Sequence, residues 1–157
     1  DVLAIAPYFG HDLGDGEASA LAAEWSVERV LDACAAEIAE MQERIVQAAE
    51  IAAVYELDLV AYESGQHLVG LGAHAEDPGL QDLFFAANRH ERMKDLYLQA
   101  MLRWSESGGT PNCLFSYCDR PSHSGSWGLL EHQGQPLDEA PKMRAVREAL
   151  AAAATMR

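Results

Sequence analysis

The architecture expected for this chain depends on one segment, Leu57-Asp58-Leu59-Val60-Ala61-Tyr62-Glu63-Ser64-Gly65-Gln66-His67. Its central run, residues 59–62, is apolar at every position, which is typical of a strand inside a parallel sheet with helices packed on both sides. Gly65 permits a sharp turn, so we expect the strand to end at Glu63. In parallel α/β proteins, ligands bind at the carboxyl ends of the strands, and Glu63 is therefore a candidate functional residue.

Two further apolar runs predict one strand earlier in the chain, at residues 2–10, and one later, at residues 113–117. Apolar residues recur at three- and four-residue steps over residues 26–55, 80–104 and 141–150, which predicts three helices between and after the strands. A strand–helix alternation indicates right-handed βαβ units and a parallel sheet. We therefore expect an α/β fold with about three βα units, forming a single domain or part of one.

Composition excludes several classes of function. The chain has 157 residues, of which 49% are hydrophobic, and this is enough for one domain with a core. Its formal net charge of −14 is unfavourable for binding nucleic acid or an anionic membrane surface. No apolar run approaches the length of a membrane span. The chain enters an apolar run directly after Asp1, so we expect it to be part of a longer protein.

The cysteines and histidines show no ligand spacing for a metal ion. Cys113 and Cys118 are five residues apart rather than at the short spacing of zinc ribbons, and Cys34 falls on the apolar face of a predicted helix. The six histidines contain no HExxH pattern. We expect neither a metal ion nor an organic cofactor.

The expected strand ends carry aromatic rings and one carboxylate. Tyr8, Glu63 and Trp127 lie within or shortly after the three predicted strands, and no glycine-rich nucleotide-binding motif follows any of them. A flat ring packs on the C–H groups of a sugar, and a carboxylate stabilises the oxocarbenium-like centre of glycoside cleavage. This combination favours a carbohydrate site.

The segments that carry these residues resemble a known family. They read AIAPYFG (4–10), LVAYESGQHLVG (59–70) and SGSWGLLEH (124–132), followed by QGQP and APKMRAV. In this order they look like the last three strand units of a retaining glycoside hydrolase of clan A, a clan of TIM barrels. The resemblance implies that the chain is the carboxyl-terminal part of a (β/α)8 barrel, covering roughly strands six to eight, and that it is secreted or periplasmic.

The resemblance also implies roles for particular residues. Glu63 matches the clan's nucleophile, Tyr8 is similar to the group that bonds the nucleophile, and Trp127 is similar to the ring beneath the sugar. Gln66 and His67 follow the nucleophile and are expected to line the substrate pocket. The chain departs from the family pattern at Ser64, where glycine is usual, so that a small hydroxyl lies beside the expected site.

The resemblance identifies no residue of this chain as the second carboxylate of the reaction. Retaining hydrolysis uses two carboxyl groups about 5–5.5 Å apart, and in the clan the acid/base lies on strand four. Asp119 and Glu131 are the substitutes that this chain offers, although loop carboxylates are usually solvated. A complete barrel takes about 250 residues. The expected partners are therefore a carbohydrate substrate and the amino-terminal barrel half, on the same or another chain.

Two other functions are compatible with the sequence. A barrel fragment of this kind could bind carbohydrate without cleaving it. Alternatively, the chain could be a partner-binding α/β domain whose acidic helices form the interface.

Overall fold

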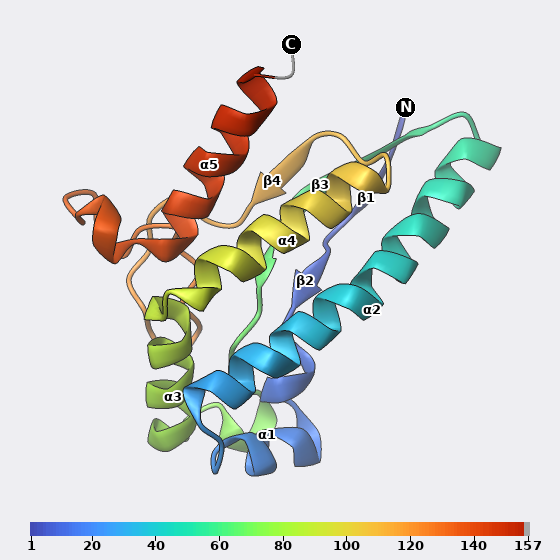
Figure 1. The fold of residues 1–157 in the computed structure, drawn as a ribbon. Helices are drawn as coiled ribbons and strands as arrows, with labels where there is room; N and C mark the ends of the chain where they lie inside the picture. Colours follow the sequence, from blue (N-terminus) through green and yellow to red (C-terminus); the bar gives the residue numbers. More distant parts are fainter. Residues whose placement is uncertain (156–157) are drawn as a thin grey trace.

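The computed structural model describes residues 1–155 and has a mixed α/β fold (Figure 1). The strands are β1 (Val2–Ile5), β2 (Tyr8–Phe9), β3 (Asp58–Gln66) and β4 (Asn112–Leu114). The helices are α1 (Gly16–Ala22), α2 (Val27–Val54), α3 (Pro78–Arg89), α4 (Arg92–Glu106) and α5 (Pro141–Thr155), with 3-10 turns at Asp12–Gly14, Gly72–His74 and Leu137–Glu139. The predicted α/β class and strand–helix alternation are confirmed.

The sheet is small and parallel, with β3 at its centre. β1 and β2 pair with one side of β3 and β4 pairs with the other, all in parallel. The first strand is interrupted between Ile5 and Tyr8, where Pro7 has no amide hydrogen to donate to a ladder. Leu3 of β1 is opposite Leu59 of β3, and Tyr8 of β2 is opposite Gly65 of β3. The outer edge of β1 pairs with no other described strand.

Helices cover one face of the sheet rather than two. Leu59 and Ala61 are buried in the core, whereas Tyr62, their neighbour on the opposite face, is 60% exposed. The same alternation is present in β1, where Val2 is exposed and Leu3 packs against the core. The expectation of helices on both sides of the central strand is therefore wrong. An apolar run can also arise from a strand with one covered face and one open face.

Helix α2 provides the longest cover over the sheet (Figure 1). It begins after Ser26, whose Oγ accepts the Arg29 amide hydrogen at 3.3 Å and thereby caps the helix. Its buried residues recur at three- and four-residue steps, so they face the sheet and α4 together. They are Val30, Leu31, Cys34, Ile38, Met41, Ile45 and Ala52. Burial raises the pKa of the Cys34 thiol to about 12, which fits a core residue rather than a reactive one.

Several predicted boundaries are wrong. The helix expected over residues 80–104 is two helices, because His90 has an extended backbone between α3 and α4. The third strand is limited to Asn112–Leu114. The central strand continues to Gln66, so Glu63 lies inside it rather than at its end. The register between β3 and β4 shifts between Ala61 and Ser64, and this irregularity surrounds Glu63.

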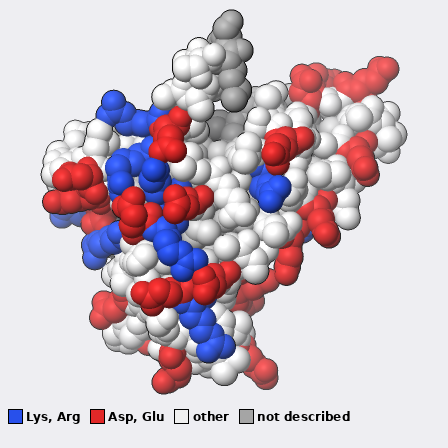
Figure 2. All heavy atoms as spheres, in the orientation of Figure 1, with Lys and Arg blue, Asp and Glu red and all other residues white. Residues whose placement is uncertain are grey.

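Charge is distributed unevenly over the face drawn in Figure 2. Basic side chains gather among acidic ones over α3, α4 and α5, where Arg89 pairs with Glu131 and Lys94 pairs with Glu148, both at 2.7 Å. Acidic side chains predominate along the opposite edge of this view. None of the described helices is both long enough and apolar enough to cross a membrane.

Candidate functional site

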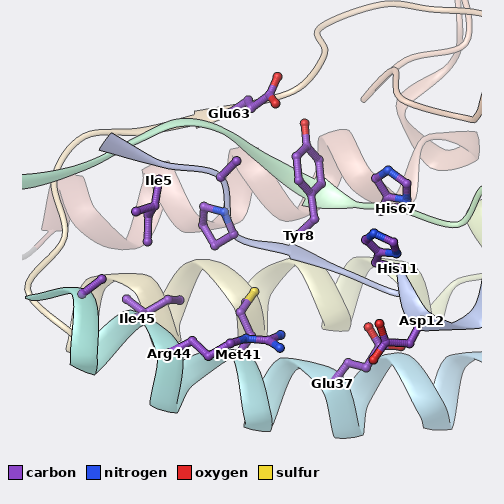
Figure 3. Close-up of a pocket in the computed structure, with 13 residues that line it drawn as sticks. Ile5, Tyr8, His11, Asp12, Glu37, Met41, Arg44, Ile45, Glu63 and His67 are labelled. Carbon is purple, nitrogen blue, oxygen red and sulfur yellow. The ribbon is translucent and has the colours of Figure 1, made fainter. Parts of the chain in front are cut away.

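Glu63 and Tyr8 meet on the side of the sheet that no helix covers. Figure 3 shows the Tyr8 ring and the Glu63 side chain on one side of the first strand, with α2 on the other side. The pKa of Tyr8 is raised to about 12, first by burial and then by the nearby carboxylate of Glu63, which disfavours the phenolate form. The structure therefore places close together the two residues that the resemblance led us to expect as a pair.

Trp127 and His67 complete a cluster of rings with Tyr8. The ring centroids lie 5.8 Å apart for Tyr8 and Trp127, 5.7 Å for Tyr8 and His67, and 5.1 Å for His67 and Trp127, each pair edge to face. Phe115 is 44% exposed and lies edge to face with Trp127, with the ring centroids 5.8 Å apart. Residues from three successive βα units thus meet at one place.

A cavity of about 550 Å³ adjoins this cluster. Glu63, Tyr8 and His67 line its upper part, and Met41 and Ile45 of α2 line its lower part (Figure 3). Its volume is within the range of small-molecule sites, and its lining combines apolar surface with a few polar groups. The cavity extends around the first strand at the open edge of the sheet.

His67 lines this cavity and stacks on His11, with the ring centroids 4.7 Å apart and the planes 18° apart. Burial lowers the pKa of His67, and the nearby imidazole of His11 lowers it further, so the neutral form is favoured. Its Nδ1 atom is buried and has no hydrogen-bond partner within residues 1–155. A ligand hydroxyl could supply that partner.

The backbone around Trp127 requires two glycines. A Cβ atom on Gly125, where φ is +123°, would lie 2.6 Å from the indole ring. A Cβ atom on Gly128 would lie 2.2 Å from the carbonyl oxygen of Leu130. The indole Nε1 donates to the carbonyl oxygen of Ser124 at 2.7 Å, so the ring is held by its own loop.

Gln66 lies away from the ring cluster. It is fully buried, its Nε2 donates to the Ser126 carbonyl oxygen at 2.9 Å, and its Oε1 accepts the Leu68 amide hydrogen at 2.7 Å. Its side-chain amide is bonded to the protein on both sides, which assigns it a structural role in place of the expected contact with substrate. Alternation along β3 explains this, because Gln66 and His67 face opposite ways.

Ser64 also points away from the site. Its Oγ lies 2.5 Å from Asn112 Oδ1 and 3.2 Å from the Cys113 carbonyl oxygen, so the hydroxyl links β3 to β4. Of the two loop carboxylates considered as substitutes for an acid/base, Glu131 is held by two hydrogen bonds from Arg89, at 2.7 and 2.9 Å. Neither Glu131 nor Asp119 lines the cavity that Glu63 lines.

Sequence reasoning missed three residues near the site, His11, Glu37 and Phe115. Glu37 accepts the Gly10 amide hydrogen at 2.6 Å, and burial raises the pKa of its carboxyl group. It lies on α2, where the helical pattern gave no reason to separate it from the solvated acidic residues. Phe115 could have been noticed, because it is an aromatic residue of the predicted strand at residues 113–117, as Tyr8 is of the predicted strand at residues 2–10. Residues 1–155 contain no group of three or more His, Cys, Asp or Glu side chains that could hold a metal ion.

No family model, curated protein or solved structure matches the chain.

Proposed function

We propose that this chain is the carboxyl-terminal part of a retaining glycoside hydrolase with Glu63 as its nucleophile. The observation that carries the proposal is that Glu63 and Tyr8 line one cavity and interact electrostatically, beside the rings of His67 and Trp127. A carboxylate flanked by rings at the open face of a parallel sheet suits a sugar whose anomeric centre becomes positively charged.

The proposed reaction is a double displacement. The Glu63 carboxylate attacks the anomeric carbon, the bond to the leaving oxygen breaks, and an acid/base outside this chain protonates that oxygen. The same acid/base then removes a proton from water, which displaces Glu63 and releases the sugar with its configuration retained. The Tyr8 hydroxyl holds the carboxylate in place, and the ring of Trp127 supports the sugar. No step requires a metal ion or organic cofactor.

The open edge of β1 suits completion of a (β/α)8 barrel by amino-terminal strands, on the same or another chain. Helices on one face and an open second face are the arrangement of a barrel wall, with the open face turned inward. The proposal therefore places the acid/base on a strand of that other half. Closure would also pair the outer edges of β1 and β4, which no described strand pairs and which are a liability for a soluble protein.

The nucleophile is tested in the assembled barrel, with Glu63→Ala compared with Glu43→Ala on the exposed surface of α2. We expect Glu63→Ala to lose turnover by several orders of magnitude, because no glycosyl-enzyme can form. Added azide should partly restore cleavage and yield a glycosyl azide of inverted configuration. Glu43→Ala should cleave like the unchanged protein. Normal turnover by Glu63→Ala would overturn the assignment.

The ring cluster would serve equally well in a protein that binds a glycan without cleaving it. In that case the cavity and the rings would keep their role, and Glu63 would only accept hydrogen bonds from sugar hydroxyls. Glycan binding without turnover, in the assembled and unchanged protein, would favour this second function.

A further inference from the structure

One buried polar network includes the sequence neighbours of two rings of the cluster, Gln66 before His67 and Ser126 before Trp127. It joins Gln66 of β3, Asn88 of α3, Lys142 of α5 and the backbone of Ser126, which precedes Trp127. All four residues are at most 6% exposed. None of them lines the cavity beside Glu63.

The donors of this network converge on one carbonyl oxygen. Gln66 Nε2 reaches the Ser126 oxygen at 2.9 Å and Lys142 Nζ reaches it at 2.5 Å. Lys142 Nζ also donates to Asn88 Oδ1 at 3.1 Å, and Asn88 Nδ2 is 3.4 Å from Gln66 Oε1. The peptide unit before Trp127 is therefore anchored to the central strand and to the last helix at once.

A buried lysine is costly, because removal from water disfavours its charged form. Burial accordingly lowers the pKa of Lys142 to about 7, and the carboxylates of Glu131 and Asp119 act weakly in the opposite direction. If α5 needed only to pack, an apolar side chain at this position would serve better. Instead, the Lys142 ammonium group donates to the carbonyl oxygen of Ser126, in the loop that carries Trp127.

We propose that Lys142 is a positioning residue, which together with Gln66 fixes the Ser126 carbonyl group and so sets the ring of Trp127 against Tyr8 and His67. The placement of the ring follows from the described contacts alone. Its consequence, support of a bound sugar, rests on the function proposed above. Lys142 acts through Trp127 and does not touch the substrate.

The proposal is tested by ¹⁹F NMR on the full chain labelled with 5-fluorotryptophan, without any sugar. The three resonances belong to Trp25, Trp104 and Trp127 and can be assigned by single replacements with Phe. In Lys142→Met we expect the Trp127 resonance to shift or broaden, because its peptide unit loses one of two anchors. The resonances of Trp25 and Trp104 should stay in place.

Lys94→Met is the matched control. Lys94 is the only other lysine of the chain, and it also contacts α5, through Glu148 at 2.7 Å. Its loss weakens the attachment of α5 without reaching the Trp127 loop, so all three resonances should be unchanged. If Lys142→Met does not fold, Lys142→Gln, which keeps a shorter polar group, is measured with the same expectation.

A Lys142 variant that melts earlier but leaves the Trp127 resonance unmoved would overturn the proposal, because the lysine would then contribute only to stability. This outcome is independent of the glycosidase assignment. That assignment would fail instead if the ring moved as expected while Glu63→Ala kept full turnover.

Discussion

At the scale of single residues, the account depends on the coupling between Glu63 and Tyr8. The sequence placed both residues near strand ends, and their meeting follows from the parallel pairing of Tyr8 with Gly65. The sequence could not show the shift in β3–β4 register between Ala61 and Ser64, the segment that contains Glu63. Such an irregularity depends on how β4 docks against β3, which no local pattern records.

This coupling predicts a change in the ionisation of Tyr8. The Tyr8 pKa of about 12 is raised by burial and by the Glu63 carboxylate, since both disfavour the phenolate. In Glu63→Gln, the charge is lost but the burial remains. We therefore expect the Tyr8 pKa to fall part of the way towards 10, the ordinary value. The measurement is a pH titration of the tyrosine Cζ resonances by ¹³C NMR.

Glu37→Gln is the control for this titration, because Glu37 lines the cavity from α2 and is not among the groups that raise the Tyr8 pKa. It should leave the Tyr8 pKa unchanged. An unaltered Tyr8 pKa in Glu63→Gln would show that the two side chains do not interact.

Gln66 shows where residue-level prediction fails. Adjacent residues of a strand face opposite ways, so Gln66 and His67 could not both line one site. The sequence alone does not show whether the side chain of Gln66 or that of His67 points towards the helices. The partners that identify Gln66 as structural, Ser126 and Asn88, lie 60 and 22 positions away.

At the scale of elements, the helices were easier to predict than the strands. The three- and four-residue steps of α2 span seven buried positions, and such a long periodic pattern is rarely ambiguous. The strand β4 contains three residues and pairs only with β3, so its limits depend on tertiary contacts. The break at His90 lacks a glycine or proline that would have marked it.

The junction of β3 and β4 provides a test at this scale. Ser64 Oγ bonds Asn112 Oδ1 across the two strands, and Ser64 is buried. We expect Ser64→Ala and Asn112→Ala each to lower the free energy of unfolding by about 1–2 kcal/mol. In a double-mutant cycle the two changes should be non-additive by about 1 kcal/mol, because either change alone removes the shared bond.

Urea denaturation of the four proteins measures this coupling. Ser105→Ala, on the exposed surface of α4, is the reference for the loss of a serine hydroxyl and should change stability by less than about 0.5 kcal/mol. Strict additivity of the Ser64 and Asn112 changes would show that the bond contributes nothing to the sheet.

At the scale of the whole molecule, three features support one interpretation. Helices cover a single face of the sheet, β1 presents an edge unpaired among the described strands, and the cavity beside Glu63 reaches around that edge. The proposed barrel accounts for the first two features, because strands of its other half would pair with the edge of β1 and enclose the open face. The net charge of −14 is compatible with a neutral glycan and unfavourable for a nucleic acid.

The alternation of strands and helices made the α/β class predictable, but the one-sided cover was not. A residue such as Tyr62, apolar and yet 60% exposed, looks the same in a sequence whether a helix or a barrel interior faces it. The distinction depends on neighbours that are distant in the chain or lie on the missing half of the proposed barrel.

The central claim, that Glu63 is the nucleophile, is tested most directly by covalent trapping. The assembled enzyme is incubated with 2-deoxy-2-fluoroglycosides that carry a dinitrophenyl leaving group, in a panel of sugar configurations, and its peptides are analysed by mass spectrometry. The account predicts a glycosyl adduct on Glu63 and its absence in Glu63→Gln. An active enzyme that carries its adduct on another residue, or that turns over glycoside without Glu63, would contradict it.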